Sequence, residues 1–220
     1  MVLVHGFATS AARTWGDNGW IDLLRDAGRD VVAIDLLGHG TADKPHDPAA
    51  YEQLEALVVE QLPDAPFDAI GFSLGARVLL TIAADRPDRF AHLVVAGVGA
   101  NLFRDDPRNE IVDAVNGNAP DDNPAAQYFA GLAAQPGVDR EALAACMRSP
   151  RPRLDDGRLA KVTMPVLVVL GDRDFAGPAD PLMDALPNAK LVTLRNVDHF
   201  ATPKDFGFID AALDFIGAGF

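Results

Sequence analysis

Short apolar runs alternate with longer helical stretches along the whole 220-residue chain, and this rhythm constrains the fold more than any other feature. Each run is nearly continuous in apolar residues, which is typical of strands that are buried on both faces. Strands separated by helices form βαβ units, so the sequence predicts an α/β fold with a mostly parallel sheet of about six strands and helices on both faces. The expected strands cover residues 1–4, 31–35, 67–71, 92–97, 165–170 and 190–194.

Helical stretches occupy most of the sequence between these runs. One connection stands apart, because residues 98–161 contain no strand and break at turns rich in Gly, Asn and Pro. Long connections in compact domains are usually functional. We therefore predict one core made of residues 1–97 and 162–220, with 98–161 inserted as a small helical cap; a helical excursion that only packs on the core is the alternative. The expected helices cover residues 17–28, 48–62, 74–86, 106–116, 124–135, 139–147, 178–186 and 205–217.

The charge balance restricts the partners of the chain. Asp and Glu outnumber Lys and Arg by 32 to 19, and the net charge of −13 argues against binding to nucleic acid or to anionic membranes.

No apolar run is long enough to span a membrane and no signal peptide is visible, so a cytoplasmic protein is expected. Cys146 is the single cysteine, which excludes an intrachain disulfide. The sequence has no Cys/His cluster and no phosphate-binding loop, and we expect no metal or organic cofactor.

Residues 71–75 read G-F-S-L-G, between an expected strand and an expected helix. A serine at the tip of such a tight turn lies in strained backbone geometry, with its hydroxyl exposed and the first amides of the helix pointing toward it. The residues two before and two after the serine must be small, and Gly71 and Gly75 meet this requirement. Ser73 is therefore the candidate nucleophile, and a glycine-rich turn with an incidental serine is the alternative.

Five histidines compete for the role of general base. His5 and His39 lie beside glycines in early loops, while His46 lies in a proline-rich loop and His92 opens a strand. His199 follows the last strand, and parallel strands end at one edge of the sheet, where functional sites collect. A histidine at this edge can reach the nucleophile, so His199 is the candidate base; a capping or surface histidine is the alternative.

The acid that orients this base should follow the strand at 165–170, within the segment G-D-R-D-F at 171–175. Asp174 lies further from the sheet and can turn toward a histidine on the next loop, so we prefer it. Asp172 is the second candidate, and we expect it to cap the turn instead.

Acyl transfer also needs two hydrogen-bond donors aimed at the developing oxyanion. The backbone N–H of Leu74, directly after the nucleophile, is expected to supply one of them. The second is expected from the loop after the first strand, where Gly6 permits a tight turn and Phe7 offers its N–H.

These segments together resemble the α/β-hydrolase superfamily. The resemblance implies Ser73 as nucleophile, Asp174 as acid, His199 as base, and Phe7 and Leu74 as oxyanion donors. It also implies a serine hydrolase that works through an acyl-enzyme, with the 98–161 segment as a cap over the pocket. The matching pieces are V-L-V-H-G-F at 2–7, D-L-L-G-H-G at 35–40, G-F-S-L-G at 71–75, P-V-L-V-V-L-G-D-R-D at 165–174 and D-H-F at 198–200, in the order of the family and over nearly the whole chain.

The chain departs from the family pattern at its start. Family members usually have two strands before the H-G loop, whereas this chain begins inside the strand that would be their third. By family topology the strand at 31–35 would then lie at a bare edge of the sheet, and such an edge invites pairing or aggregation. Two explanations are open: the natural chain begins upstream, or a second subunit covers the edge in a homodimer.

The triad does not define the substrate. Small to medium carboxylic esters are the expected substrates, and a same-fold lyase, thioesterase, lactonase or C–C hydrolase is the alternative. Arg77, in S-L-G-A-R, is similar to a feature of the menaquinone-pathway lyases that share the fold, although an arginine there can simply form a salt bridge. A ligand-binding member without turnover is the less favoured class. Four aromatic residues are candidates for lining a mostly apolar pocket: Phe103, Phe129, Phe175 and Phe200. For the aromatic residues of the insertion, Phe103, Tyr128 and Phe129, packing that holds the cap on the core is the alternative.

A group of arginines closes the insertion, and we prefer to interpret it as a solvated basic loop. Attraction of an anionic group is the alternative. The group consists of Arg148, Arg151, Arg153 and Arg158.

Overall fold

A single six-stranded sheet forms the centre of the molecule in the computed structural model, which describes residues 1–104, 108–151 and 153–219. The strands lie in the order β2-β1-β3-β4-β5-β6, and every neighbouring pair is parallel. The predicted α/β fold class is therefore confirmed. The strands are β1 (Val2–Val4), β2 (Val32–Ile34), β3 (Phe67–Phe72), β4 (Phe90–Ala96), β5 (Val166–Gly171) and β6 (Ala189–Leu194).

Alternate residues of the buried strands pack into two separate hydrophobic cores. Val2 and Val4 of β1 join one core, while Leu3 between them joins the other. Neighbouring side chains on a strand point to opposite faces, so a nearly continuous apolar strand must be covered on both sides. This requirement explains why the sequence places helices on both faces of the sheet.

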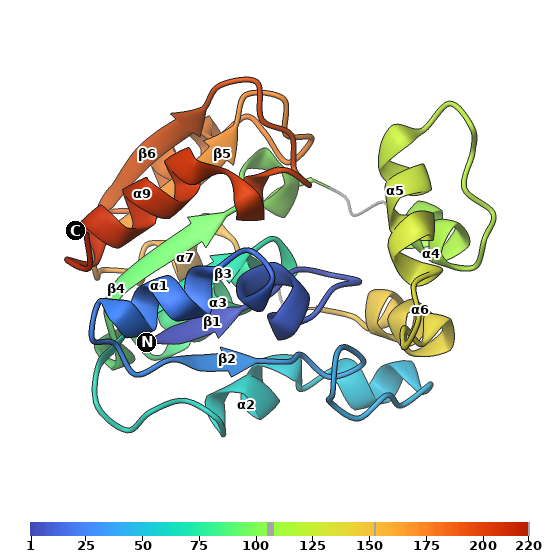
Figure 1. The fold of residues 1–220 in the computed structure, drawn as a ribbon, viewed down its shortest axis with the longest axis horizontal. Coiled ribbons are helices and arrows are strands. Elements are labelled where there is room, and N and C mark those ends of the chain that lie inside the picture. The colour runs from blue at the N-terminus through green and yellow to red at the C-terminus, as the bar shows by residue number, and fades with distance from the viewer. Residues whose placement is uncertain (105–107, 152, 220) are drawn as a thin grey trace.

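One face of the sheet is covered by α1 (Trp20–Asp26) and α9 (Phe206–Phe215), which lie side by side across the sheet in Figure 1. Trp20 packs against Phe208 with ring centroids 4.7 Å apart, and its indole N–H donates to the carbonyl of Pro203 at 2.7 Å. A π-helical turn, η1 (Ala12–Gly16), precedes α1 and adds the buried Trp15 to the same core. The sequence did not predict this turn, whose five residues form less than two helical turns.

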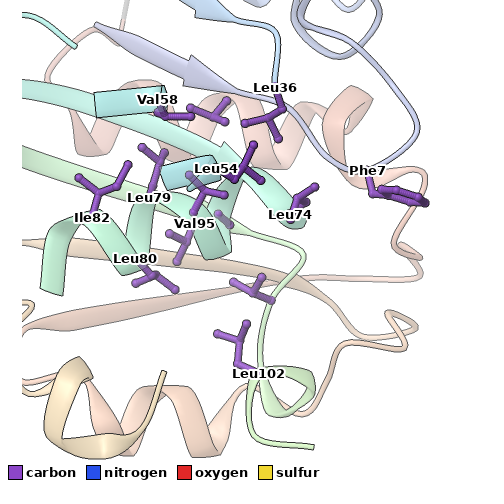
Figure 2. Packing of buried hydrophobic residues seen from close by; sticks show 14 of the residues in the cluster. Phe7, Leu36, Leu54, Val58, Leu74, Leu79, Leu80, Ile82, Val95 and Leu102 are labelled. Carbon is purple, nitrogen blue, oxygen red and sulfur yellow. The ribbon is translucent and has the colours of Figure 1, made fainter. Parts of the chain in front are cut away.

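The other face is covered by α2 (Leu54–Val59), α3 (Leu74–Asp85), α7 (Asp156–Leu159) and α8 (Asp180–Ala185). Figure 2 shows side chains of α2 and α3, among them Leu54 and Leu79, meeting Val95 of β4. The helix expected over 48–62 is divided, because Gln53 leaves helical geometry between η2 (Pro48–Tyr51) and α2. The four-residue α7 was not expected either, and Asp155 caps its start by accepting from the amide of Arg158.

Three helices of the long insertion gather beyond the carboxyl ends of the strands, apart from the sheet (Figure 1). They are α4 (Arg108–Val115), α5 (Pro124–Ala133) and α6 (Arg140–Arg148). The starts of α5 and α6 follow from local chemistry, because the side chains of Asn123 and Asp139 cap these two helices by accepting from backbone amides. Residues 106 and 107, which were expected to begin the first of these helices, lie outside the described residues.

Strand β2 lies at one edge of the sheet, as the family resemblance implied, and Val32 on it is 38% exposed. Pairing of this edge with a second copy stays a prediction. Within the described residues, no helix combines the length and the apolar character needed to cross a membrane.

Candidate active site

Ser73 sits at a sharp elbow between β3 and α3. Its backbone has a φ of +52°, which residues other than glycine rarely adopt. The surroundings hold this conformation, since the Ser73 amide donates to the carbonyl of Ala96 at 2.8 Å and the Ser73 carbonyl accepts from the Arg77 amide at 3.0 Å. The elbow lifts the hydroxyl away from the sheet at the carboxyl end of β3.

Backbone contacts explain the two glycines of the motif. A Cβ on Gly75 would lie 2.2 Å from the carbonyl oxygen of Val4, because α3 starts directly against β1. A Cβ on Gly71 would lie 2.7 Å from the Cα of Ala76, inside the elbow itself. The steric requirement that the sequence suggested is therefore present at both positions.

The three predicted triad residues form one hydrogen-bonded chain. His199 Nδ1 lies 2.9 and 3.0 Å from the two carboxylate oxygens of Asp174, and His199 Nε2 lies 3.0 Å from Ser73 Oγ. An ionised carboxylate only accepts, so Nδ1 carries the proton and Nε2 presents a lone pair to the serine hydroxyl. Asp174 and His199 are both buried. This arrangement can remove a proton from Ser73 and hold the positive charge that results.

Aromatic rings fix the position of His199. Its imidazole lies between Phe72, at 4.9 Å between centroids, and Phe175, at 4.3 Å. Gly97, with a φ of +68°, leaves room behind the ring, since a Cβ there would lie 3.0 Å from His199 Cε1. The role of Phe72 was not anticipated, although its place beside Ser73 in the motif is a signal that could have found it.

The neighbouring acids are occupied elsewhere. Asp172 accepts from the backbone amide of Asn196 at 2.7 Å and so ties together the loops after β5 and β6. Asp198 accepts from the amides of Phe200 and Ala201 and closes the turn that follows the histidine. Among the two candidates for the acid, the structure brings Asp174 to the histidine ring.

The other histidines do not reach Ser73. His92 Nδ1 lies 2.8 Å from a carboxylate oxygen of Asp68, and the exposed His46 bonds to Asp139 on the insertion. His5 and His39 are buried below the site in neighbouring loops, with centroids 5.3 Å apart. Burial lowers the pKa of His5 to about 4 and the pKa of His39 to about 3. Both rings are therefore neutral at physiological pH.

The two predicted oxyanion donors flank the serine. Leu74 is the first residue of α3, and Phe7 lies in the loop after β1, beside the same two cavities as Ser73. Within the described residues, no backbone carbonyl or side chain accepts from the N–H of Phe7 or of Leu74. Both amides are therefore available to a substrate oxygen.

Two cavities meet at Ser73. The first, of about 310 Å³, has a mixed lining and includes Asn18 and Lys204 beside aromatic side chains in its wall. The second, of about 330 Å³, is largely apolar and includes Leu74 and Met147. Phe7, Ser73 and Phe129 border both cavities.

The four aromatic candidates for the pocket lie in different places. Phe129 borders both cavities, Phe200 borders the first and Phe175 the second. Phe103 borders neither of these two cavities and packs against the main core, as its alternative interpretation held.

Several polar residues at the cavities were missed, because no local pattern marks them. Asn18 and Arg13 reach the first cavity from the segment around η1, and Arg104 reaches the second from the start of the insertion. The arginines that close the insertion were expected to form a solvated basic loop, but Arg151 among them borders the second cavity. Within the described residues, no three His, Cys, Asp or Glu side chains gather closely enough to hold a metal ion.

A family model described as the alpha/beta hydrolase family matches residues 1–210. A pimeloyl-(acyl-carrier protein) methyl ester esterase from Neisseria meningitidis serogroup B is 30% identical over 233 residues, covering 90% of this chain and 84% of the relative.

Solved structures share the same fold. An enol-lactonase from Burkholderia xenovorans superposes with a TM-score of 0.75 at 21% identity, covering 98% of this chain and 90% of the other. A 2-hydroxy-6-oxo-6-phenylhexa-2,4-dienoate hydrolase from a Rhodococcus strain gives a TM-score of 0.72 at 22% identity, covering 98% and 89%. At these identities the likeness concerns the fold alone.

Proposed function

The chain belongs to the alpha/beta hydrolase family, and on that premise we propose that it is a serine hydrolase of small to medium carboxylic esters. The observation that carries the proposal is the buried hydrogen-bonded chain from Asp174 through His199 to Ser73, at the meeting point of two cavities. The relative named as a methyl ester esterase supports the same class of substrate.

In the proposed mechanism, His199 Nε2 takes the hydroxyl proton as Ser73 Oγ attacks the ester carbonyl. Asp174 holds the imidazole in the required tautomer and stabilises its charged form. The amides of Phe7 and Leu74 bind the oxyanion, and each such donor contributes about 10²- to 10³-fold in kcat. His199 then passes the proton to the departing alcohol. A water molecule activated by the same nitrogen hydrolyses the acyl-enzyme and regenerates the serine.

The two cavities suggest where the halves of the ester bind. Apolar side chains dominate the second cavity, so the acyl chain is assigned there, where burial of each CH₂ contributes about 0.8 kcal/mol. The first cavity, whose wall mixes polar and aromatic side chains, receives the alcohol. Residues 98–161 act as a cap in this proposal, since Phe129 on α5 borders both cavities and Met147 on α6 borders the acyl side.

Hydrolysis of p-nitrophenyl acetate and butyrate, beside the Ser73→Ala variant, tests the proposal. We expect p-nitrophenol release by the native protein and a loss of at least about 10³-fold in the variant, because the nucleophile is absent. Labelling of Ser73 by a fluorophosphonate without turnover would indicate a reactive serine behind a selective pocket. The absence of both turnover and labelling would contradict the proposed function.

Two further statements belong to this proposal. A homodimer that pairs at β2 predicts a mass in solution of twice the 23.4 kDa of one chain. Size-exclusion chromatography with light scattering measures that mass, and a value for one chain contradicts the dimer. A cytoplasmic location stays a prediction.

A further inference from the structure

The acyl cavity carries positive charge that an ordinary apolar ester does not need. Three arginines, Arg77, Arg104 and Arg151, border it together with apolar side chains, and its described lining contains no Asp or Glu. The whole chain carries a net charge of −13. A local excess of arginine in so acidic a chain points to an anionic ligand.

Arg151 is held in place at one end and unpartnered at the other. Its Nη2 donates to the carbonyl of Cys146 at 2.8 Å, which fixes the guanidinium beside the end of α6. Its Nη1 is buried, and no atom of the described residues accepts a hydrogen bond from it. A buried donor without an acceptor is destabilising, and a bound carboxylate would supply the missing acceptor.

The other arginines that close the insertion, and Arg104, have different surroundings from Arg151. Arg158 pairs with Asp85 on the surface, with Nη2 2.8 Å from a carboxylate oxygen. Arg148 and Arg153 are exposed. Arg104 lies at the exposed rim of the cavity and donates to the carbonyl of Gly177 at 2.7 Å. Arg104 is therefore an exposed arginine of this cavity, whereas Arg151 is half-buried and has a buried Nη1.

We propose that the acyl cavity binds a chain with a second carboxylate at its far end, and that Arg151 binds this carboxylate. The natural substrate is then a half-ester of a dicarboxylic acid. This inference rests on the proposed function of Ser73. The cavity volume of about 330 Å³ corresponds to roughly eleven water-sized groups at about 30 Å³ each, which suits an acyl chain of adipate length.

Two methyl esters of equal carbon number test the inference. Monomethyl adipate has a terminal carboxylate where methyl hexanoate has a methyl group. We expect the native protein to hydrolyse monomethyl adipate with at least about tenfold higher kcat/KM, because a hydrogen bond between charged groups favours the half-ester by about that factor. Equal rates, or faster hydrolysis of the neutral ester, would overturn the inference and leave the esterase function intact.

The variant Arg151→Met removes the charge and keeps an apolar side chain. We expect its kcat/KM to fall about 10- to 100-fold for monomethyl adipate and to change less than about threefold for methyl hexanoate. Arg158→Met is the matched control, since it removes a surface arginine of the same segment that pairs with Asp85. An equal loss on both esters in Arg151→Met would contradict a charge-specific role.

Binding without turnover separates this inference from the proposed chemistry. Calorimetric titration of monomethyl adipate into the Ser73→Ala variant should give measurable binding. The affinity of the double variant Ser73→Ala/Arg151→Met should be about tenfold weaker or more. Arg151→Lys keeps the charge without the two-pronged geometry and should fall between the two if it folds as the native protein does. Undiminished binding in the Arg151→Met background would overturn the inference, whatever the activity of Ser73.

Discussion

Asp172 and Asp174 lie two residues apart in the loop after β5. Because they have different hydrogen-bond partners, we expect different consequences when either loses its charge. In Asp174→Asn we expect kcat for p-nitrophenyl butyrate to fall by about 10⁴-fold, because the amide no longer favours the tautomer with a proton on His199 Nδ1. Asp172→Asn is the control, since Asp172 accepts from the Asn196 amide and not from His199. Its activity should change less than about tenfold. A similar loss in both variants would contradict Asp174 as the orienting acid.

At this scale, the sequence predicted the residues that lie within short motifs. Ser73 is marked by two glycines, and His199 and Asp174 each follow a recognisable strand. Arg151 could not be assigned from sequence, because its position depends on how α6 ends against the core rather than on its neighbours in the chain. The same limit applies to Phe103, whose packing against the core depends on a fold-level contact.

The junction between β1 and α3 depends on the absence of a side chain at Gly75. In Gly75→Ala the new Cβ would lie 2.2 Å from the Val4 carbonyl oxygen, so strand and helix would have to separate. We expect a loss of at least about 3 kcal/mol in the free energy of unfolding, measured by urea denaturation.

Gly131→Ala is the matched control for this substitution. Gly131 lies within α5, is exposed, and has nothing within 4 Å of an added Cβ. Alanine is favoured over glycine in a helix, so this variant should gain about 0.5 to 1 kcal/mol. Loss of stability in both variants would show that the close contact at Gly75 is not the cause.

A pH-sensitive contact joins the loop before η2 to the start of α6. His46 Nε2 lies 3.0 Å from a carboxylate oxygen of Asp139, and this hydrogen bond raises the pKa of His46 above its usual value. A raised histidine pKa stabilises the folded state below pH of about 6.5, and the contribution disappears as pH rises through the raised value. Amide exchange in α6, after correction for the intrinsic rate, should therefore become faster above neutral pH.

His46→Gln provides the control for this contact, because glutamine does not titrate. Its amide exchange in α6, after correction for the intrinsic rate, should stay flat between pH 6 and 8. The same pH dependence in the native protein and in the variant would rule out His46 as its source.

Strands, the elbow and most helices could be predicted because their signals are local, in periodicity and in turn chemistry. The π-helical turn at Ala12–Gly16 could not, since it places its own Trp15 in a core that forms only in the assembled fold. The pair of cavities is also a property of the assembled fold. Asn18 and Leu132 border the first cavity although more than a hundred residues separate them along the chain.

Acid sensitivity of the whole molecule follows from the two buried histidines. His5 Nε2 accepts from the Leu36 amide at 3.0 Å, so protonation there would place two donors face to face. Because burial lowers the pKa of both rings, the folded state excludes protons that the unfolded chain binds. Their stabilising contribution is complete above pH of about 6.5 and declines as pH falls, by about 3 kcal/mol for each ring at pH 4.

Urea denaturation at pH 7, 5.5 and 4 measures this decline. His39→Leu should unfold with a smaller loss of stability between pH 7 and pH 4 than the native protein, because one titrating ring is absent. Its absolute stability at pH 7 is not the readout, since the carbonyl of Leu37 loses its partner in the variant. An unchanged slope would show that other groups cause the acid sensitivity.

The meeting of two cavities at one serine also bears on how such a protein can change over generations. Apart from Phe7, Ser73 and Phe129, the two walls share no residue within the described lining. Substitutions far apart and without common partners usually have additive effects. Where residues of the two walls do not contact one another, preference for the acid and preference for the alcohol can therefore change separately, so that a lineage can acquire a new alcohol partner while it keeps its acid. Phe175 and Phe200, one from each wall, are neighbours and are an exception. Divergence among descendants would then follow two independent paths from a single conserved reaction.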